Sequence, residues 1–332
     1  MLRFLNRLKQ VRFQDIIKSL LVFDLNRDAT KTIIVAGEGR SGSSWLAEMI
    51  NWKHDMRSMF EPFHPRFSNL WQVMKTKYKT YLSETSTDPV LAQAIQKVLT
   101  GQLRSPRIDR YNRTFFLPKK RIIKLIHANL WLKWIRKHYP STPIVLILRN
   151  PLAIAASRTF FAKGAWLKPS SFYDEQELCD VYLKPFRYYV DEKLQEFERS
   201  VLSVSIVYYV LLKELKEADN ILLTSYEMLQ VDFEKEMKKI WKYLSFEWDD
   251  AILDLKNKKS HTTGVRWTKG YSSFQSPQGP LTYWKTQVTK EQIESGLKIM
   301  RAFGLDAIYS EQELPNMQAV YDRIKAGSQR KS

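Results

Sequence analysis

A glycine- and serine-rich loop near the start of the chain has the strongest chemical signature in the sequence. It reads Gly37-Glu38-Gly39-Arg40-Ser41-Gly42-Ser43-Ser44-Trp45, between an apolar β-branched run and a helical pattern. A strand, a glycine loop and a helix in this order direct backbone N–H groups toward a phosphate. The spacing is that of a phosphate loop, but Ser43 stands where nucleoside-triphosphate enzymes carry a lysine. The loop therefore predicts a phosphate-bearing ligand and disfavours a kinase or an ATPase.

A second candidate for phosphate binding follows a later apolar run. Arg149 comes directly after residues 143–148, and Ser157 lies about two helical turns further along. Ligands of open parallel sheets bind at the carboxyl ends of the strands, which is where this arginine is expected. A guanidinium and a hydroxyl together suit a monoester phosphate. An arginine that ends a strand is often structural, so Arg149 indicates a phosphate site only in combination with the first loop.

Both features depend on a scaffold of short apolar runs that alternate with helical patterns. The runs predict strands buried on both faces; they are residues 32–36, 121–126, 143–148 and 220–224, with a short further strand before Glu61. The helical patterns are residues 129–138, 152–162, 174–218 with a break, 233–244 and a helix after Thr289. This alternation predicts an α/β fold of the phosphate-loop type, in which helices flank a central, mostly parallel sheet in three layers.

Composition limits the partners and the compartment. The 332 residues include 53 Lys and Arg against 35 Asp and Glu, a net charge of +18, which predicts an anionic ligand or polymer. No nucleic-acid-binding motif accompanies that charge, so we expect no nucleic-acid partner. The single cysteine, Cys179, excludes a disulfide framework within the chain, and neither cysteine nor histidine spacing predicts a metal site. No apolar run approaches the roughly 18 residues of a membrane span.

The first residues form a basic, amphipathic segment. Residues 1–25 interleave leucine, isoleucine and phenylalanine with arginine and lysine, and their apolar runs are too short for a signal peptide. The segment is expected either to pack on its own domain or to rest on an anionic membrane. We predict three parts: residues 1–28 as this segment, residues 29–325 as a single domain, and residues 326–332 as a flexible tail. We expect a cytoplasmic protein, with contact to the inner face of the membrane as a further option.

The two phosphate features, in this order, resemble the nucleotide-binding motifs of sulfotransferases that use 3′-phosphoadenosine 5′-phosphosulfate (PAPS). In that family the first loop holds the 5′-phosphosulfate and the second motif holds the 3′-phosphate. The resemblance implies that the donor is bound by Arg40, Ser41, Gly42, Ser43, Ser44, Trp45, Arg149 and Ser157. Similar segments extend from about Thr32 to Tyr309, and they add Tyr226 near the adenine and a late basic loop at Lys269 and Gly270. PAPS would be the co-substrate, 3′-phosphoadenosine 5′-phosphate (PAP) the product, and no metal would be needed.

The sequence Glu61-Pro62 resembles an element of the carbohydrate sulfotransferases, in which the glutamate is the general base. The resemblance implies that Glu61 takes the proton of the acceptor hydroxyl, while Lys124 and Arg40 stabilise the sulfuryl group or the leaving oxygen. His64 and His127 are competing bases. Small-molecule sulfotransferases have Lys-x-His on the equivalent strand, but His127 is shifted by one residue, which turns a strand side chain to the other face. We therefore place His64, His127 and Arg158 on the acceptor side.

These features predict an enzyme that transfers a sulfuryl group from PAPS to a hydroxyl of a carbohydrate or glycolipid by in-line displacement. Three alternatives remain at this point. The acceptor is a non-carbohydrate alcohol or phenol, the protein is a phosphate-loop kinase that requires magnesium, or it is a non-catalytic module that binds acidic polymers. A kinase leaves the missing lysine unexplained, and a non-catalytic module leaves the two phosphate motifs unexplained.

Overall fold

The computed structural model describes residues 13–65, 70–73, 78–114, 116–161, 168–190, 193–258, 260 and 279–329. Within these residues five strands form one sheet in the order β2-β3-β1-β4-β5, and each neighbouring pair is parallel. The strands are β1 (Thr32–Gly37), β2 (Arg57–Phe60), β3 (Arg121–Leu125), β4 (Ile144–Leu148) and β5 (Leu222–Ser225). The predicted parallel α/β sheet is confirmed, because each β-branched run forms a strand.

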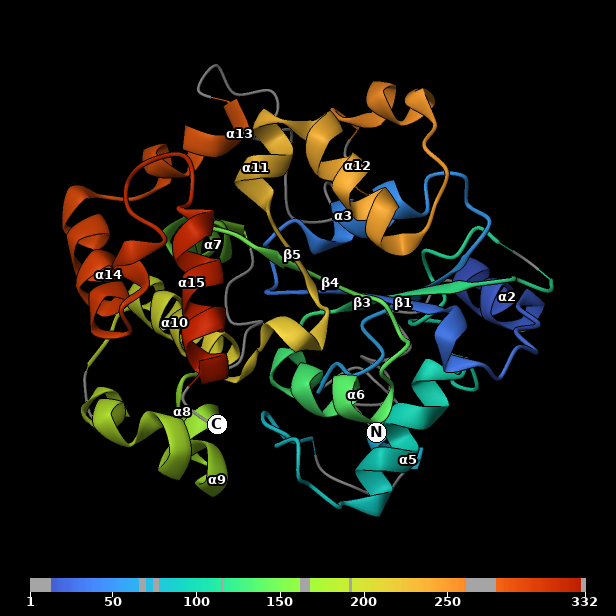
Figure 1. Cartoon of the computed structure of the whole chain (residues 1–332), viewed down its shortest axis with the longest axis horizontal. Helices are drawn as coiled ribbons and strands as arrows, with labels where there is room; N and C mark the ends of the chain where they lie inside the picture. Colours follow the sequence, from blue (N-terminus) through green and yellow to red (C-terminus); the bar gives the residue numbers. More distant parts are fainter. Residues whose placement is uncertain are drawn as a thin grey trace.

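Helices cover both faces of the sheet and complete the three layers (Figure 1). Alternate residues of β1 point to opposite sides: Ile33 and Val35 pack in one hydrophobic cluster, and Ile34 and Ala36 in another. The first cluster includes side chains of α3 (Ser43–Ile50), α11 (Tyr226–Val231) and α12 (Phe233–Leu244). The second includes side chains of α5 (Pro89–Leu99), α6 (Leu132–His138), α7 (Pro151–Phe161), α10 (Glu196–Glu214), α14 (Lys290–Ala302) and α15 (Met317–Gln329). The strands are apolar on both sides because both sides are covered.

The remaining elements qualify several sequence predictions. The short helices are α4 (Leu70–Val73), α8 (Ser170–Tyr173), α9 (Gln176–Leu178) and α13 (Gly279–Thr282). The break expected within residues 174–218 separates α9 from α10, and Thr289 caps α14 through the reciprocal bonds with Gln292. Helix α15 reaches Gln329, inside the segment expected as a tail. Most of the loop expected at residues 260–281 lies outside the described residues. None of the described helices has the length and hydrophobicity to span a bilayer.

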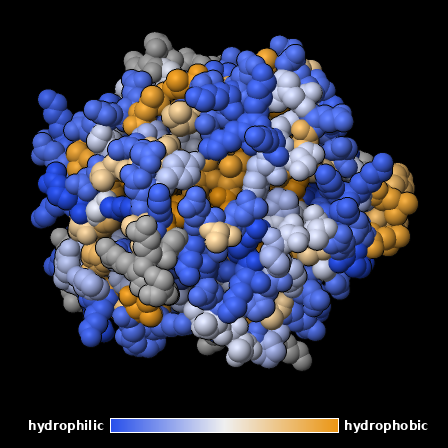
Figure 2. Space-filling model, in the orientation of Figure 1, coloured by the Kyte–Doolittle hydropathy of each residue, from blue (hydrophilic) through white to orange (hydrophobic). Residues whose placement is uncertain are grey.

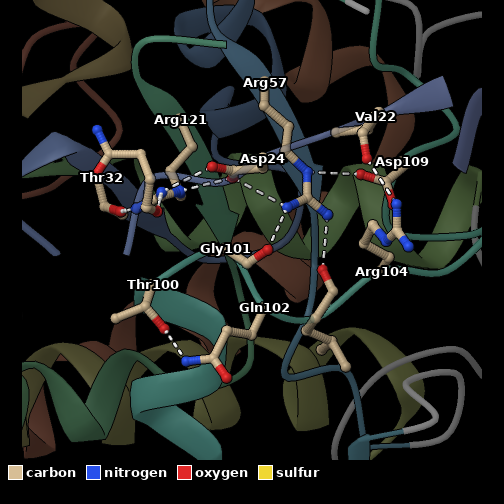
Figure 3. Close-up of polar contacts among 12 residues, drawn as sticks. Val22, Asp24, Thr32, Arg57, Thr100, Gly101, Gln102, Arg104, Asp109 and Arg121 are labelled. Atoms are coloured by element: carbon tan, nitrogen blue, oxygen red, sulfur yellow. Dashed lines mark hydrogen bonds and ion pairs between the residues drawn. The ribbon is translucent and has the colours of Figure 1, made fainter. Parts of the chain in front are cut away.

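The segment around Asp24, after helix α2, is fastened to the amino-terminal end of the sheet by a buried ionic cluster (Figure 3). Arg57 and Arg121 are the first residues of β2 and β3 and are cross-strand partners. Asp24, which follows α2 (Phe13–Leu21), lies 3.1 Å from Nη1 of Arg57 and 2.9 Å from Nε of Arg121. Asp109 lies 2.9 Å from Nε of Arg57. We call these four residues the amino-end cluster; their side chains are at most 2% exposed.

Candidate active site

The phosphate-loop sequence forms the turn that its glycines require. A Cβ atom on Gly37 would lie 2.7 Å from the carbonyl oxygen of Ile147, so no larger residue fits between β1 and β4. Gly42 has a φ of +93°, and a Cβ atom there would lie 2.6 Å from the ring of Tyr226. Gly42 is also the residue before α3, whose first N–H groups lack acceptors within the helix. The loop therefore presents backbone donors where a phosphate can approach closely.

The second motif reaches the same place because of the strand order. Strand β1 lies between β3 and β4, so the order reverses next to the loop that follows β1, and ligands of such sheets bind at this point. Nη1 of Arg149, after β4, donates to the backbone oxygen of Arg40 over 2.9 Å. Nε of Arg40 donates to Oγ of Ser157, also over 2.9 Å. The guanidinium of Arg149 lies 4.2 Å from the ring centre of Tyr226. The structure thus brings these predicted donor-site residues together.

Positive charge is concentrated between the two motifs. Burial, together with the nearby charges of Arg149 and Arg158, lowers the pKa of Arg40 to about 10. Among the described residues, Oγ of Ser41 and Nε of Arg149 are buried polar atoms without a hydrogen-bond partner. Buried polar groups are normally paired, so these atoms point to a ligand that supplies acceptors. The residues present therefore fit the phosphates of PAPS.

Arg149 is also held by residues that the sequence did not single out. The hydroxyl of Tyr208, in α10, accepts the N–H of Arg149 and donates to its carbonyl oxygen. The next peptide N–H, of Asn150, donates to the carboxylate of Glu227 over 2.8 Å. Glu227 directly follows the predicted donor-site residue Tyr226, whereas Tyr208 is far from every predicted motif, and no spacing rule connects either residue to Arg149. They fix the backbone from which the guanidinium projects.

Glu61 lies where β2 ends, between two cationic side chains. Its N–H donates to the carbonyl of Lys124, which continues the ladder between β2 and β3, and its φ of +48° then turns the chain away from the sheet. Its carboxylate lies 2.7 Å from Nζ of Lys124 and 3.2 Å from Nη2 of Arg107. Burial would raise the pKa of Glu61, but the charges of Lys124, Arg107 and His127 lower it to about 2. We call Glu61, Lys124 and Arg107 the carboxyl-end cluster.

His127 and His64 lie beside this cluster with their ring centres 4.5 Å apart. Burial lowers the pKa of His127 to about 3, and the charge of His64 contributes, so His127 is neutral at physiological pH. Strand β3 ends at Leu125, so His127 lies beyond the strand. The alternation of strand faces, on which its demotion as a base rested, does not extend to it.

Arg158 contacts the phosphate loop and lines a pocket together with His127. Its guanidinium lies 2.6 Å from the carboxylate of Glu38 and donates to the carbonyl of Gly39. Asn129 also bonds the loop, accepting the N–H of Gly37 and donating to Glu38. A pocket opens here; its polar lining consists of Glu38, Thr80, His127, Asn129, Arg158 and Ser203. Arg158 was expected to bind the acceptor; the structure shows that it holds the phosphate loop, and its role toward an acceptor stays a prediction.

Two groups of residues complete the comparison with the sequence. Lys269 and Gly270, expected at the donor site, lie outside the described residues. Arg107 is not among the predicted site residues, and Glu38 was named only as a loop residue, yet both contact predicted site residues. A charged residue inside a glycine loop was the available signal for Glu38. Arg107 is 46 positions from Glu61, so no local pattern could have paired them.

Comparisons with known proteins relate this chain to a family. Residues 30–311 match the sulfotransferase domain family. Similar solved structures include the mouse sulfotransferase SULT7A1 complexed with PAP, with 16% identity and a TM-score of 0.39, covering 87% of this chain and 89% of that chain. Retinol dehydratase complexed with androsterone and PAP has 13% identity and a TM-score of 0.44, covering 90% and 86%. Sulfotransferase STF9 from Mycobacterium avium has 12% identity and a TM-score of 0.40, covering 91% and 81%.

No curated protein gave a significant match to the sequence. The family match alone spans most of the chain, including the phosphate loop, Glu61 and Arg149. The chain therefore belongs to the sulfotransferase domain family, whose enzymes take the sulfuryl group from PAPS.

Proposed function

We propose that this enzyme transfers the sulfuryl group of PAPS to a hydroxyl of a carbohydrate or glycolipid, with Glu61 as the general base. The observation that supports the proposal most directly is the position of Glu61. It lies at the carboxyl end of β2, next to Lys124. The charge of His127 affects the pKa of Glu61, and the charge of Arg158, which contacts the phosphate loop, affects the pKa of His127. Glu61, as the proposed base, thus lies at the same carboxyl end of the strands as the phosphate loop and Arg149.

The donor side follows from the residues already described. The loop from Arg40 to Trp45 would hold the phosphosulfate, and Arg149 with Ser157 would hold the 3′-phosphate. The bond from Arg40 to Ser157 and the bond from Arg149 to the backbone of Arg40 join these residues. Because phosphate oxygens are strong acceptors, they can replace these internal contacts with charge-assisted hydrogen bonds.

The chemical step requires Glu61 to become a stronger base than its ion pairs allow. A carboxylate with a pKa of about 2 takes a proton poorly. We propose that Lys124 turns from Glu61 toward the sulfuryl group when the donor binds, which raises the pKa of Glu61. The acceptor oxygen then forms a bond to sulfur while the bond from sulfur to the phosphate oxygen breaks. The proton of the acceptor hydroxyl passes to Glu61, and Lys124 stabilises the phosphate oxygen that leaves.

The polar part of the pocket lining supports a polyhydroxylated acceptor. Carboxylate, amide, imidazole, hydroxyl and guanidinium groups all contribute to its lining. Such groups exchange hydrogen bonds with sugar hydroxyls, whereas a phenol would gain most from apolar walls. The second candidate, a non-carbohydrate alcohol or phenol, is supported by the apolar part of the same lining, Ile126, Leu130, Phe172 and Val207.

Calorimetric titration with PAP in metal-free buffer tests the donor site, with ATP and magnesium as the comparison. We expect micromolar affinity for PAP and no binding of ATP with magnesium. The reverse result would contradict the assignment, and binding of neither would favour a non-catalytic anion-binding role.

An acceptor screen then separates the two candidates for the acceptor. Sulfur-labelled PAPS would be incubated with neutral glycans, anionic glycans, glycolipids and simple phenols, and each product would be counted after separation. Transfer to a sugar hydroxyl that disappears in Glu61→Gln supports the proposal. Efficient transfer to phenols alone would replace the carbohydrate acceptor with the small-molecule one.

A further inference from the structure

Helix α2 presents its apolar side to solvent and its polar side to the protein. Asp15 and Ser19 are its buried residues, at 6% and 7% exposure. Phe13 and Leu20, by contrast, are 75% and 62% exposed. Surface helices of globular proteins normally have the opposite arrangement, with an apolar stripe against the core. The inverted helix therefore needs an apolar environment that the described part of the chain does not provide.

Neighbouring segments extend the same apolar surface. Phe23 and Leu25 follow the helix and are exposed, as are Phe116 and Leu117 from the connection that leads to β3. The rings of Phe23 and Phe116 stack with centres 6.3 Å apart, and the N–H of Phe116 donates to the carbonyl of Leu21. Hydrophobic side chains stand at the right-hand edge of the molecule in Figure 2, over the region where Figure 1 places α2. We call Phe13, Leu20, Phe23, Leu25, Phe116 and Leu117 the apolar face.

The charges around the apolar face are predominantly positive. Asp15 and Asp24 are buried and paired with arginines, so they contribute little negative charge at the surface. Nζ of Lys18 donates to the carbonyl of Arg110, and the guanidinium of Arg27 donates to the carbonyls of Asp24 and Thr100, so neither cation is neutralised by these bonds. Lys119, close to Leu117 in sequence, is exposed.

An apolar face with a basic surround matches one kind of partner. We propose that this face inserts into the headgroup boundary of a membrane that contains anionic lipids. Apolar side chains enter the boundary while lysine and arginine meet the lipid phosphates, which is how interfacial helices bind. A second copy of the chain is a poorer partner, because a symmetric contact would bring the basic surrounds of two molecules of net charge +18 together. The inference does not depend on the identity of the acceptor.

Cosedimentation of the full chain with lipid vesicles tests the proposal. The vesicles are phosphatidylcholine alone, or phosphatidylcholine in which about a third of the lipid is phosphatidylglycerol. We expect binding to the anionic vesicles, weak binding to the neutral ones, and loss of binding in high salt. Leu20→Asp combined with Leu117→Asp should lower the apparent affinity more than about tenfold, because two insertion sites become charged.

Val181→Asp is the matched control, because Val181 is 62% exposed, as Leu20 is, but lies on the connection between α9 and α10. It should leave vesicle binding unchanged, and PAP affinity should be the same in all variants, which verifies the fold. The proposal would be overturned if the wild-type protein did not bind anionic vesicles, or if the double variant bound them as tightly as the wild type. If the wild type sedimented as a dimer without lipid and the double variant as a monomer, the apolar face would be assigned to a second copy of the chain instead.

Discussion

Strands β2 and β3 carry a charged cluster at each end, and the two clusters differ in balance. The amino-end cluster pairs two arginines with two aspartates, all almost fully buried. The carboxyl-end cluster places the single carboxylate of Glu61 between Lys124 and Arg107. The amino-end cluster is therefore neutral overall, whereas the carboxyl-end cluster has a net positive charge.

The pKa values of the carboxylates show the consequence. Burial raises the pKa of Asp109 even though Arg57 opposes the shift. Burial acts on Glu61 in the same direction, but the surrounding positive charges reverse it and lower the pKa of Glu61. The amino-end cluster is balanced in charge, whereas the carboxyl-end cluster carries a net positive charge, as a site that binds an anion requires. The same two strands thus carry a structural cluster at one end and the cluster that we propose to be catalytic at the other.

The largest expected effect comes from Glu61→Gln. Without the base, turnover should fall by about 100- to 10,000-fold, whereas PAP affinity should be nearly unchanged because no donor contact is removed. Initial-rate assays and calorimetry measure the two quantities. A parallel loss of nucleotide affinity would mean that Glu61 belongs to the donor site. Glu234→Gln, which removes an exposed ion pair with Lys238, is the control and should leave both quantities unchanged.

Asp24→Asn tests the other end of the strands. It leaves Arg57 and Arg121 short of a buried counter-charge, so the free energy of unfolding should fall by about 3–5 kcal/mol. Urea unfolding measures the loss, and the protein that remains folded should bind PAP as the wild type does. Full stability in this variant would show that the amino-end cluster does not hold the fold as we infer.

Arg149→Ala separates binding from chemistry within the site. Loss of a charge-assisted contact with the 3′-phosphate should weaken PAP binding by about 2–4 kcal/mol. Calorimetry with PAP and with the analogue that lacks the 3′-phosphate checks this, because the analogue should be insensitive to the substitution. A change in PAP affinity below about tenfold would contradict the 3′-phosphate role.

The smallest effect concerns acid stability. The pKa of Glu61 is about 2 in the folded protein, below the ordinary value of 4.5, so its ionised form stabilises the fold above about pH 4.5. That stabilisation is lost as the pH falls from about 4.5 toward 2, with a slope of at most about 1.4 kcal/mol per pH unit. Glu61→Gln should therefore have a shallower acid slope than the wild type in urea titrations between about pH 5 and 3. Parallel slopes would contradict a lowered pKa of Glu61 in the folded protein.

The sequence predicted those parts of the molecule that local patterns determine. Apolar runs and glycine spacing identified the sheet and the phosphate loop, because strand burial and a left-handed turn at Gly42 depend on nearby residues. Arg149 was found because a strand end and a helix start flank it directly.

Contacts between distant segments were beyond those patterns. Arg107 reaches Glu61 through tertiary folding, and Tyr208 reaches Arg149 from the middle of a long helix. The amphipathic pattern of the first residues was visible, but its orientation was not, because periodicity does not say which face is buried. The inversion of α2 depends on the position of Asp15 beside Arg110, which only the folded chain provides.

The sharing of Asp24 also has a consequence for the order in which the chain assembles. Asp24 is synthesised before its partners Arg57 and Arg121, which follow 33 and 97 residues later. Closing contacts over such long separations costs chain entropy and is slow. Asp24 and the adjoining helix α2 therefore take their final positions only after β3 has been synthesised.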